Sequence, residues 1–186
     1  MDYSYPSREA VRVPAGYHFR PSDDEVLEHF LLRRVLGRPL TPNPIQELDI
    51  FRYDPEQLPL DIRERSDGEG PWGYFFVYGK LGDDEGGGDG VRTTPGGYWK
   101  VKGIEKDIMD RKKKETIGFI REMVFYRGKA PRGKKTVWVL LEYRLNPTLG
   151  QLKNPHDTKV GLTTLIFVFT LGIYKLIVSF IQLFDV

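Results

Sequence analysis

The sequence predicts an α+β domain in which helices precede an antiparallel β-sheet and a hydrophobic tail follows it. One segment near the start has the apolar spacing of a helix, and the middle of the chain holds β-branched and aromatic runs separated by Gly-rich turns. Hydrophobic residues form 40% of the 186 positions and aromatic residues 13%, which is enough for one folded core. Helices followed by a run of strands are typical of the α+β class.

The predicted helix begins after Ser22 and ends at Gly37. Glu25 follows Ser22 by three positions, which is the spacing of a capping box. Residues 1–12 are polar and predict a flexible N-terminus. Connections that contain proline follow at 41–49 and 54–59, and the second is predicted to form a short helix or turn. Apolar residues on one face of the helix are Val26, Leu27, Phe30, Leu31 and Val35.

The predicted strands have the composition of a buried sheet. A Gly- and Asp-rich tract at 82–90 interrupts them and predicts a loop. The strand runs are 72–78, 97–101, 116–120, 123–126 and 135–145.

The charge is distributed unevenly along the chain. Residues 98–135 hold thirteen Lys or Arg against five Asp or Glu, whereas residues 1–97 hold eleven against eighteen. The net charge of +2 therefore conceals one strongly basic block. Such a block favours a polyanionic partner, and its Trp and Tyr residues favour nucleic acid. On charge alone, a solvated charged face is an equal alternative.

The tail, residues 161–184, has a single charge at Lys175. As a helix it would be about 36 Å long, enough to cross a hydrocarbon core of roughly 30 Å. Lys175 would cost about 2.5–3.5 kcal/mol at the bilayer centre, less than the apolar residues return. Because the run is rich in Ile, Val and Phe, a buried strand is the alternative interpretation.

Nothing in the sequence favours catalysis or a bound cofactor. The chain has no cysteine, and His18, His29 and His156 lack the spacing of metal ligands. Gly86–Gly88 has neither a preceding hydrophobic strand nor a following helix, so it does not form a phosphate-binding loop. We therefore expect no enzyme activity, no cofactor and no metal. The N-terminus also lacks the pattern of a secretory signal.

Six short blocks of the sequence carry a family resemblance. They are Val13–Val26, Ile45–Ile50, Trp72–Phe76, Gly97–Lys106, Val124–Gly133 and Glu142–Leu145. Their order is that of plant NAC-domain transcription factors, and the last two match the family pattern almost literally. The chain thus resembles that family over residues 13–145.

The resemblance implies a twisted antiparallel sheet flanked by short helices, which works as a dimer and binds double-stranded DNA in the nucleus. In such proteins the strand of the Gly97–Lys106 block enters the major groove. By this resemblance the residues expected nearest to the groove are Arg92, Lys100, Val101, Lys102, Gly103 and Lys106. Residues expected to supply charge toward the phosphates are Lys112, Lys113, Lys114, Arg121, Lys129, Arg132, Lys134 and Lys135. Tyr98, Trp99 and Trp138 are expected to be core or hairpin anchors instead of stacking on bases.

Two departures from the family pattern concern binding. Val101-Lys102 stands where the family has Ala-Thr, so we expect an altered sequence preference and a larger electrostatic share of affinity. His18 stands where the family has an Arg that pairs with the Glu at Glu25 across the dimer interface. Histidine has a reference pKa near 6.5, which predicts a looser dimer with itself or with related NAC proteins.

The third departure follows Leu145, where the closing strand of the family and its long activation region are not recognisable. The expected domain is therefore residues 13–150, incomplete at its C-terminal end, with a linker at 151–160 and the tail at 161–184. One interpretation is a regulator tethered to a membrane through the tail. Another is a truncated or mis-spliced form, which would sequester full-length relatives by dimerising with them.

Overall fold

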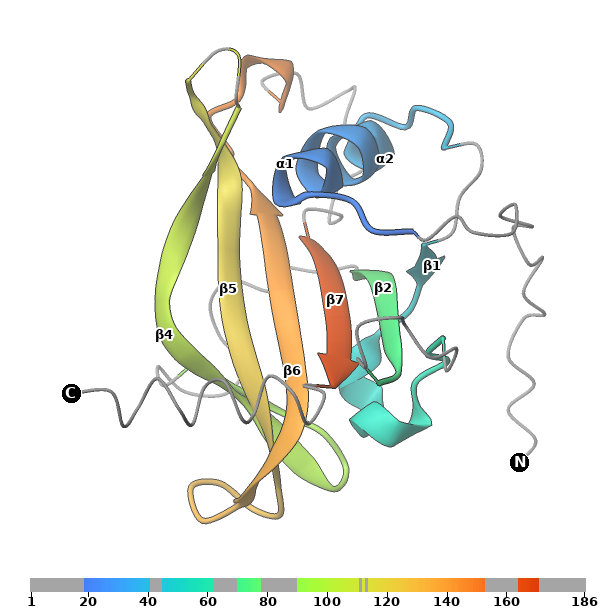
Figure 1. The fold of residues 1–186 in the computed structure, drawn as a ribbon, viewed down its shortest axis with the longest axis vertical. Coiled ribbons are helices and arrows are strands. Elements are labelled where there is room, and N and C mark those ends of the chain that lie inside the picture. Colours follow the sequence, from blue (N-terminus) through green and yellow to red (C-terminus); the bar gives the residue numbers. More distant parts are fainter. Residues whose placement is uncertain are drawn as a thin grey trace.

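A computed structural model describes residues 19–40, 45–61, 70–77, 90–110, 112, 114–152 and 164–170. These residues form one curled seven-stranded sheet in the order β1-β2-β7-β6-β5-β4-β3, with a helix packed against part of one face (Figure 1). The strands pair antiparallel except for β1, which runs parallel to β2. The sheet is thus mixed, and the predicted antiparallel sheet is corrected at this one edge. The short β1 was not predicted, because a strand of two residues is too short to show the alternation of apolar and polar residues.

The strand bounds differ from the predicted runs in three main ways. The run 97–101 continues to Met109, the runs 116–120 and 123–126 belong to one long strand, and the short β3 was not predicted. The strands are β1 Gln46–Glu47, β2 Trp72–Val77, β3 Val91–Thr93, β4 Gly97–Met109, β5 Thr116–Arg127, β6 Lys134–Leu145 and β7 Thr164–Thr170. Three short 3-10 turns connect them: η2 Ile50–Arg52, η3 Pro55–Gln57 and η4 Gly150–Leu152.

The helical segment is continuous from Asp23 to Val35, as α1 Asp23–Glu25, a π-helical stretch η1 Val26–Leu32 and α2 Arg33–Val35. The predicted capping box is present at its N-terminus. The predicted stop is also confirmed, because Gly37 takes a φ of +66° that glycine adopts without strain. Arg38 N–H then donates to the Arg33 carbonyl, which closes the helix end.

Each face of the sheet carries its own hydrophobic cluster. The helix buries its apolar face against one side of β2, β5, β6 and β7, whereas the segment 45–61 covers the other side. Tyr98, Trp99 and Trp138 are buried, which confirms their expected role as core residues. The helix-side cluster is centred on Leu27, Leu31, Phe76 and Leu165, and the second cluster on Ile50, Phe75, Trp99, Phe125 and Ile166.

The first part of the predicted hydrophobic tail forms a central strand. β7 pairs antiparallel with β2 on one side and with β6 on the other, so Phe167 lies opposite both Tyr74 and Leu141. Over residues 164–170 the predicted membrane-spanning helix is therefore wrong, and the alternative of a buried strand is confirmed. The physical reason is its content of Ile, Val and Phe: a strand buried on both faces is a continuous apolar run, which hydropathy alone cannot separate from a spanning helix.

The same strand corrects the expectation that the sheet lacks a closing strand, because β7 fills the space between β2 and β6. Within the residues that the structure describes, no helix is long and apolar enough to cross a membrane. Residues 171–184 of the predicted tail, the predicted N-terminal segment 1–12 and most of the 82–90 tract lie outside the described residues.

Candidate nucleic-acid interface

The edge of β4 leaves the regular sheet at the predicted groove-entering block. β4 and β5 keep register from Gly97 opposite Arg127 to Lys102 opposite Glu122, and pairing resumes only at Lys106. Residues 103–105 of β4 therefore lie opposite Arg121 alone, which makes a bulge. Gly103 supports it with a φ of +75°.

The bulge is the most open part of the strand. Residues 102–107 are all exposed, and Ile104 is 83% exposed. On its outer side β4 pairs with β3 from Tyr98 to Lys100, and the Val101 N–H donates to the Gly90 carbonyl. Among the described strands none continues this pairing, so the bulge forms a free edge of the sheet.

The three leading lysines of the prediction, Lys100, Lys102 and Lys106, are all exposed along this edge. Lys102 Nζ lies 2.9 Å from Glu122 Oε1 across the strand pair. Lys106 borders a shallow depression between β4 and the start of the helix, whose lining includes Asp23 and Asp24. Arg92 on β3 is half-buried, and Val101 is half-buried against the second hydrophobic cluster. The predicted edge residues therefore lie together, although acidic side chains accompany two of the lysines.

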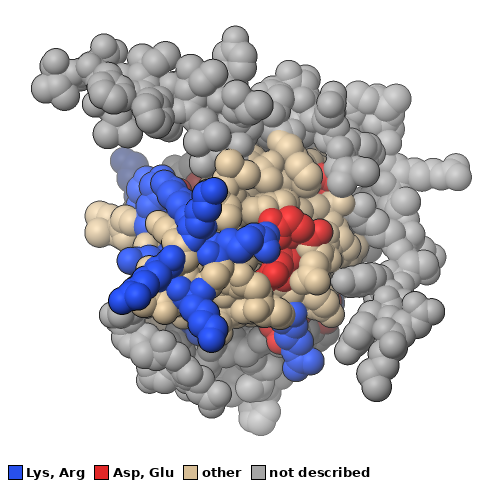
Figure 2. Space-filling view, turned by 90° about the horizontal axis from the view of Figure 1, so that it is seen from below, with Lys and Arg blue, Asp and Glu red and all other residues tan. Residues whose placement is uncertain are grey.

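A second group of predicted basic residues occupies the lower end of the sheet in Figure 1. The connection between β5 and β6 exposes these side chains, and the view from below shows Lys and Arg gathered on this end (Figure 2). They are Lys129, Arg132, Lys134 and Lys135.

A third group lies at the opposite end. Lys112 and Lys114 are exposed at the connection between β4 and β5, at the upper end of the sheet in Figure 1. The thirteen residues of β4 separate the two ends by about 40 Å. The basic block thus does not form one surface, and Lys113 lies outside the described residues.

Arg121 differs from the other predicted phosphate contacts because its charge is already paired. Its Nη2 lies 2.5 Å from Glu142 Oε2, and its Nε donates to the same oxygen at 2.7 Å. Glu142 is only 2% exposed. A buried carboxylate needs such a partner, so Arg121 neutralises Glu142 within the sheet.

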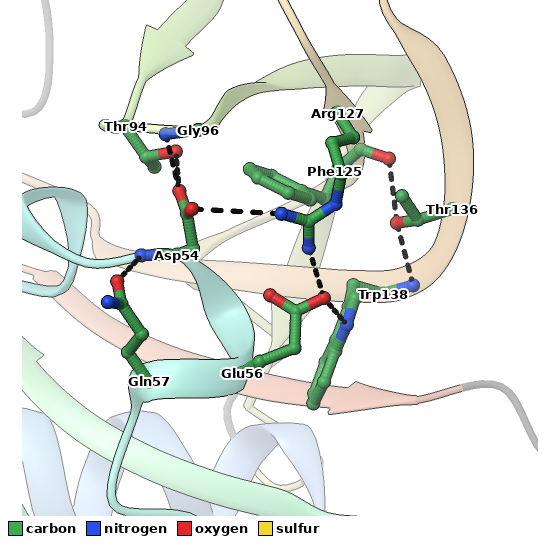
Figure 3. A network of polar contacts seen from close by, with 9 residues as sticks. All are labelled: Asp54, Glu56, Gln57, Thr94, Gly96, Phe125, Arg127, Thr136 and Trp138. Atoms are coloured by element: carbon green, nitrogen blue, oxygen red, sulfur yellow. Dashed lines mark hydrogen bonds and ion pairs between the residues drawn. The ribbon is translucent and has the colours of Figure 1, made fainter.

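A polar network fixes the lower end of β4 to the segment 45–61 (Figure 3). Asp54 Oδ1 accepts hydrogen bonds from Thr94 Oγ1 at 2.5 Å and from the Gly96 N–H at 2.9 Å, in the turn between β3 and β4. Arg127 at the end of β5 reaches Asp54 Oδ2 at 3.8 Å. The β3–β4 hairpin that carries Arg92 and Lys100 is thereby anchored to the turn at η3.

Glu56 joins the same network from the side of β6. Its Oε1 accepts hydrogen bonds from Arg127 Nη2 at 2.5 Å and from Trp138 Nε1 at 3.0 Å. The hydrogen bond to Glu56 is the main cause that raises the pKa of Arg127. This network was not predicted from the sequence, because its members lie far apart along the chain and share no motif. Two of its acidic residues do fall in the turn predicted at 54–59.

The predicted dimer pair is only partly visible. His18 lies outside the described residues. Glu25 Oε2 accepts hydrogen bonds from the Ser22 N–H at 2.9 Å and from Ser22 Oγ at 3.0 Å. These bonds, the backbone one first, lower the pKa of Glu25. Within one chain the Glu25 carboxylate therefore caps the helix.

Comparisons with known proteins agree with the block order seen in the sequence. The chain matches the family model described as No apical meristem (NAM) protein over residues 14–145. It is 39% identical over 142 residues to NAC domain-containing protein 41 of Arabidopsis thaliana and 43% identical over 143 residues to NAC domain-containing protein 22 of Oryza sativa subsp. japonica. It is 37% identical over 140 residues to the NAC transcription factor ONAC010 of Oryza sativa subsp. indica. These alignments cover 76%, 75% and 75% of this chain but 49%, 43% and 32% of the respective relatives, so the chain spans about half their length or less.

Proposed function

Because the chain belongs to the NAC-domain (No apical meristem) family, we propose that it is a transcription regulator that binds double-stranded DNA through the edge of β4. The observation that carries the proposal is the exposed stretch of β4 at residues 102–107, which contains the bulge, does not pair with β3 and includes Lys102 and Lys106. An edge of this kind offers side chains to a groove without requiring the sheet to open.

An exposed strand edge of this kind can enter the major groove. The groove is about 12 Å wide and admits a two-stranded ribbon. In the proposed arrangement Lys100 and Lys106 approach phosphates on either side, and Gly103 allows the backbone to come close. Ile104, which the sequence prediction did not include, presents an apolar side chain that fits the methyl group of thymine. The edge thus combines positioning contacts with one candidate for base readout.

The two other basic groups are assigned different roles. The connection between β5 and β6, with Lys129, Arg132, Lys134 and Lys135, lies at the end of the sheet where β3 ends and β4 begins. We propose that these residues contact flanking phosphates of the same duplex. Lys112 and Lys114 lie at the far end of β4 and are assigned no contact with that duplex. This division supplies matched control variants.

The test is fluorescence anisotropy on a panel of labelled duplexes at several salt concentrations. The double variant Lys100→Gln/Lys106→Gln should weaken binding to every duplex and reduce the slope of log K against log salt by about 1.8, since each phosphate contact contributes about 0.9. The control Lys112→Gln/Lys114→Gln removes the same charge from the far end and should leave the slope within about 0.5 of the wild-type value. Equal losses in the two double variants would refute the assignment to the β4 edge.

Sequence readout needs a separate measurement. Ile104→Ala should narrow the difference in affinity between the preferred duplex and a scrambled one while keeping the salt slope. A variant that binds both duplexes with the wild-type ratio would show that Ile104 reads no base.

Nuclear location and pairing with a second NAC chain complete the proposal, and family membership supports both. Sedimentation velocity of the full chain at pH 6 and pH 8 would test the looser, pH-dependent dimer predicted from His18. Imaging of a tagged chain would test the location. A tight dimer at both pH values, or a chain confined to membranes, would contradict these two parts.

A further inference from the structure

Three acidic side chains in the middle of the sheet are each matched with one basic side chain. Glu142 pairs with Arg121, Glu105 pairs with Arg144, and Glu122 pairs with Lys102. The first pair includes a buried carboxylate and therefore serves the fold. The third lies at the candidate interface and has a different consequence.

The Lys102–Glu122 pair occupies the last register position before the bulge. The two residues are direct cross-strand partners, and Nζ of Lys102 lies 2.9 Å from Oε1 of Glu122. The side chains are 59% and 36% exposed, so water screens the pair and it contributes little to stability. The Lys102 ammonium is therefore directed back across β5, although it belongs to the edge strand.

We propose that Glu122 restrains Lys102 and sets how much that lysine contributes to DNA affinity. The inference rests on the proposed DNA-binding function. A phosphate that approaches Lys102 must displace the carboxylate, and the carboxylate itself repels the phosphates nearby. Lys102 consequently adds less than Lys100 or Lys106 to binding, and Glu122 keeps sequence-independent affinity low. Glu122 acts through Lys102 and is a positioning residue.

The experiment measures anisotropy of the full chain on a labelled duplex of scrambled sequence between about 50 and 200 mM salt. Glu122→Gln should bind about two- to fivefold more tightly at the low end of that range, which corresponds to the usual strength of an exposed ion pair. The salt slope should steepen by about 0.9, because one further phosphate contact forms. The gain should therefore shrink about three- to fourfold across the range.

Two controls separate the ion pair from a general charge effect. Asp49→Asn removes the same charge from another exposed ion pair, on the segment 45–61, but releases Arg52 instead of Lys102, and it should leave the slope unchanged. In the Lys102→Gln background, Glu122→Gln should add nothing to the slope, because the lysine that it releases is absent. Urea unfolding of each variant verifies that the chain is folded.

The outcomes distinguish the two proposals. If the wild-type chain binds and Lys100→Gln/Lys106→Gln weakens it, but Glu122→Gln changes neither affinity nor slope, the restraint by Glu122 is overturned and the DNA-binding edge stands. A slope that steepens equally in Asp49→Asn also overturns the restraint. If no variant binds any duplex, both proposals fall.

Discussion

The two halves of β4 show opposite behaviour within one strand. Residues 97–101 lie between β3 and β5 and include the buried Tyr98 and Trp99. Residues 102–107 are exposed throughout and contain the bulge. The first half is also tied to the segment 45–61 by the Asp54 and Glu56 network. The contrast indicates that the protein presents an open edge by fixing the strand immediately before it.

Two glycines of β4 make the same contrast at atomic scale. A Cβ on Gly97 would meet the Tyr126 carbonyl oxygen and the Phe125 ring, closer than Cβ atoms are normally found. A Cβ on Gly103 would have nothing within 4 Å, although its φ of +75° disfavours any other residue. Gly97 is therefore required by packing and Gly103 by backbone conformation.

The largest expected effect comes from β7, the central strand that lies between β2 and β6. Ile166 of β7 is fully buried in the second cluster, so Ile166→Ala should lower the free energy of unfolding by about 2–5 kcal/mol. Ile104→Ala offers a matched control, because the same atoms are removed from an exposed site and the change should stay within about 0.5 kcal/mol. Urea unfolding followed by circular dichroism measures both. Equal stability of the two variants would mean that β7 is not part of the sheet.

The glycine contrast gives the next effect. Gly97→Ala should cost about 3 kcal/mol, at the upper end of overpacking costs, because the contact is with backbone. Gly103→Ala should cost about 1 kcal/mol through backbone strain alone, yet weaken DNA binding by moving the bulge. Gly97→Ala should therefore lose more unfolding free energy than Gly103→Ala, whereas Gly103→Ala should lose more DNA affinity. Urea unfolding and anisotropy measured on both variants test this reversal. A stable Gly97→Ala protein would show that the first half of β4 is not tightly held.

The network that fixes the first half has a smaller expected effect. Glu56→Ala leaves the indole N–H of Trp138 without its acceptor and should lower the free energy of unfolding by about 1–3 kcal/mol. Glu56→Gln keeps an acceptor for Trp138 but loses the charge that faces Arg127, so its cost should be intermediate. Thermal unfolding of the three proteins provides the order. If Glu56→Gln and Glu56→Ala lost equal stability, the ion pair with Arg127 would account for the whole effect and the hydrogen bond from Trp138 for none of it.

How far the sequence predicts this molecule depends on the range of the interactions. The helix from Asp23 to Val35 and its two ends follow from local signals, namely the Ser22 and Glu25 spacing and the glycine after the last turn. The strand runs follow from composition. The position of β7 does not, because hydropathy is identical for a buried central strand and for a spanning helix, and only pairing with β2 and β6 decides between them.

For the candidate site, the sequence likewise predicted the location but not the grouping or pairing of its basic residues. The blocks located the β4 edge, and Lys100, Lys102 and Lys106 do lie along it. The grouping of the remaining basic residues needed the topology, since a strand of thirteen residues puts Lys112 and Lys129 at opposite ends. Pairing of Lys102 with Glu122 needed the register, which the sequence does not fix when a bulge follows. Once the hairpin between β4 and β5 is recognised, the opposite charges on the two strands are the available signal.

The smallest expected effect concerns the helix start, which borders the open half of β4 beside Lys106. Hydrogen bonds from Ser22 lower the pKa of Glu25 below its ordinary value of 4.5. Because the folded pKa is the lower one, the stability that Glu25 contributes is present above about pH 4.5 and is lost as the pH falls through the folded pKa. The difference in unfolding free energy between wild type and Glu25→Gln should therefore be constant above that pH and shrink below it. Ser22→Ala should retain part of this dependence, because the backbone N–H of residue 22 still donates to the carboxylate. If the difference in unfolding free energy between wild type and Glu25→Gln stayed constant down to about pH 3, the capping box would not stabilise the helix beside the open edge.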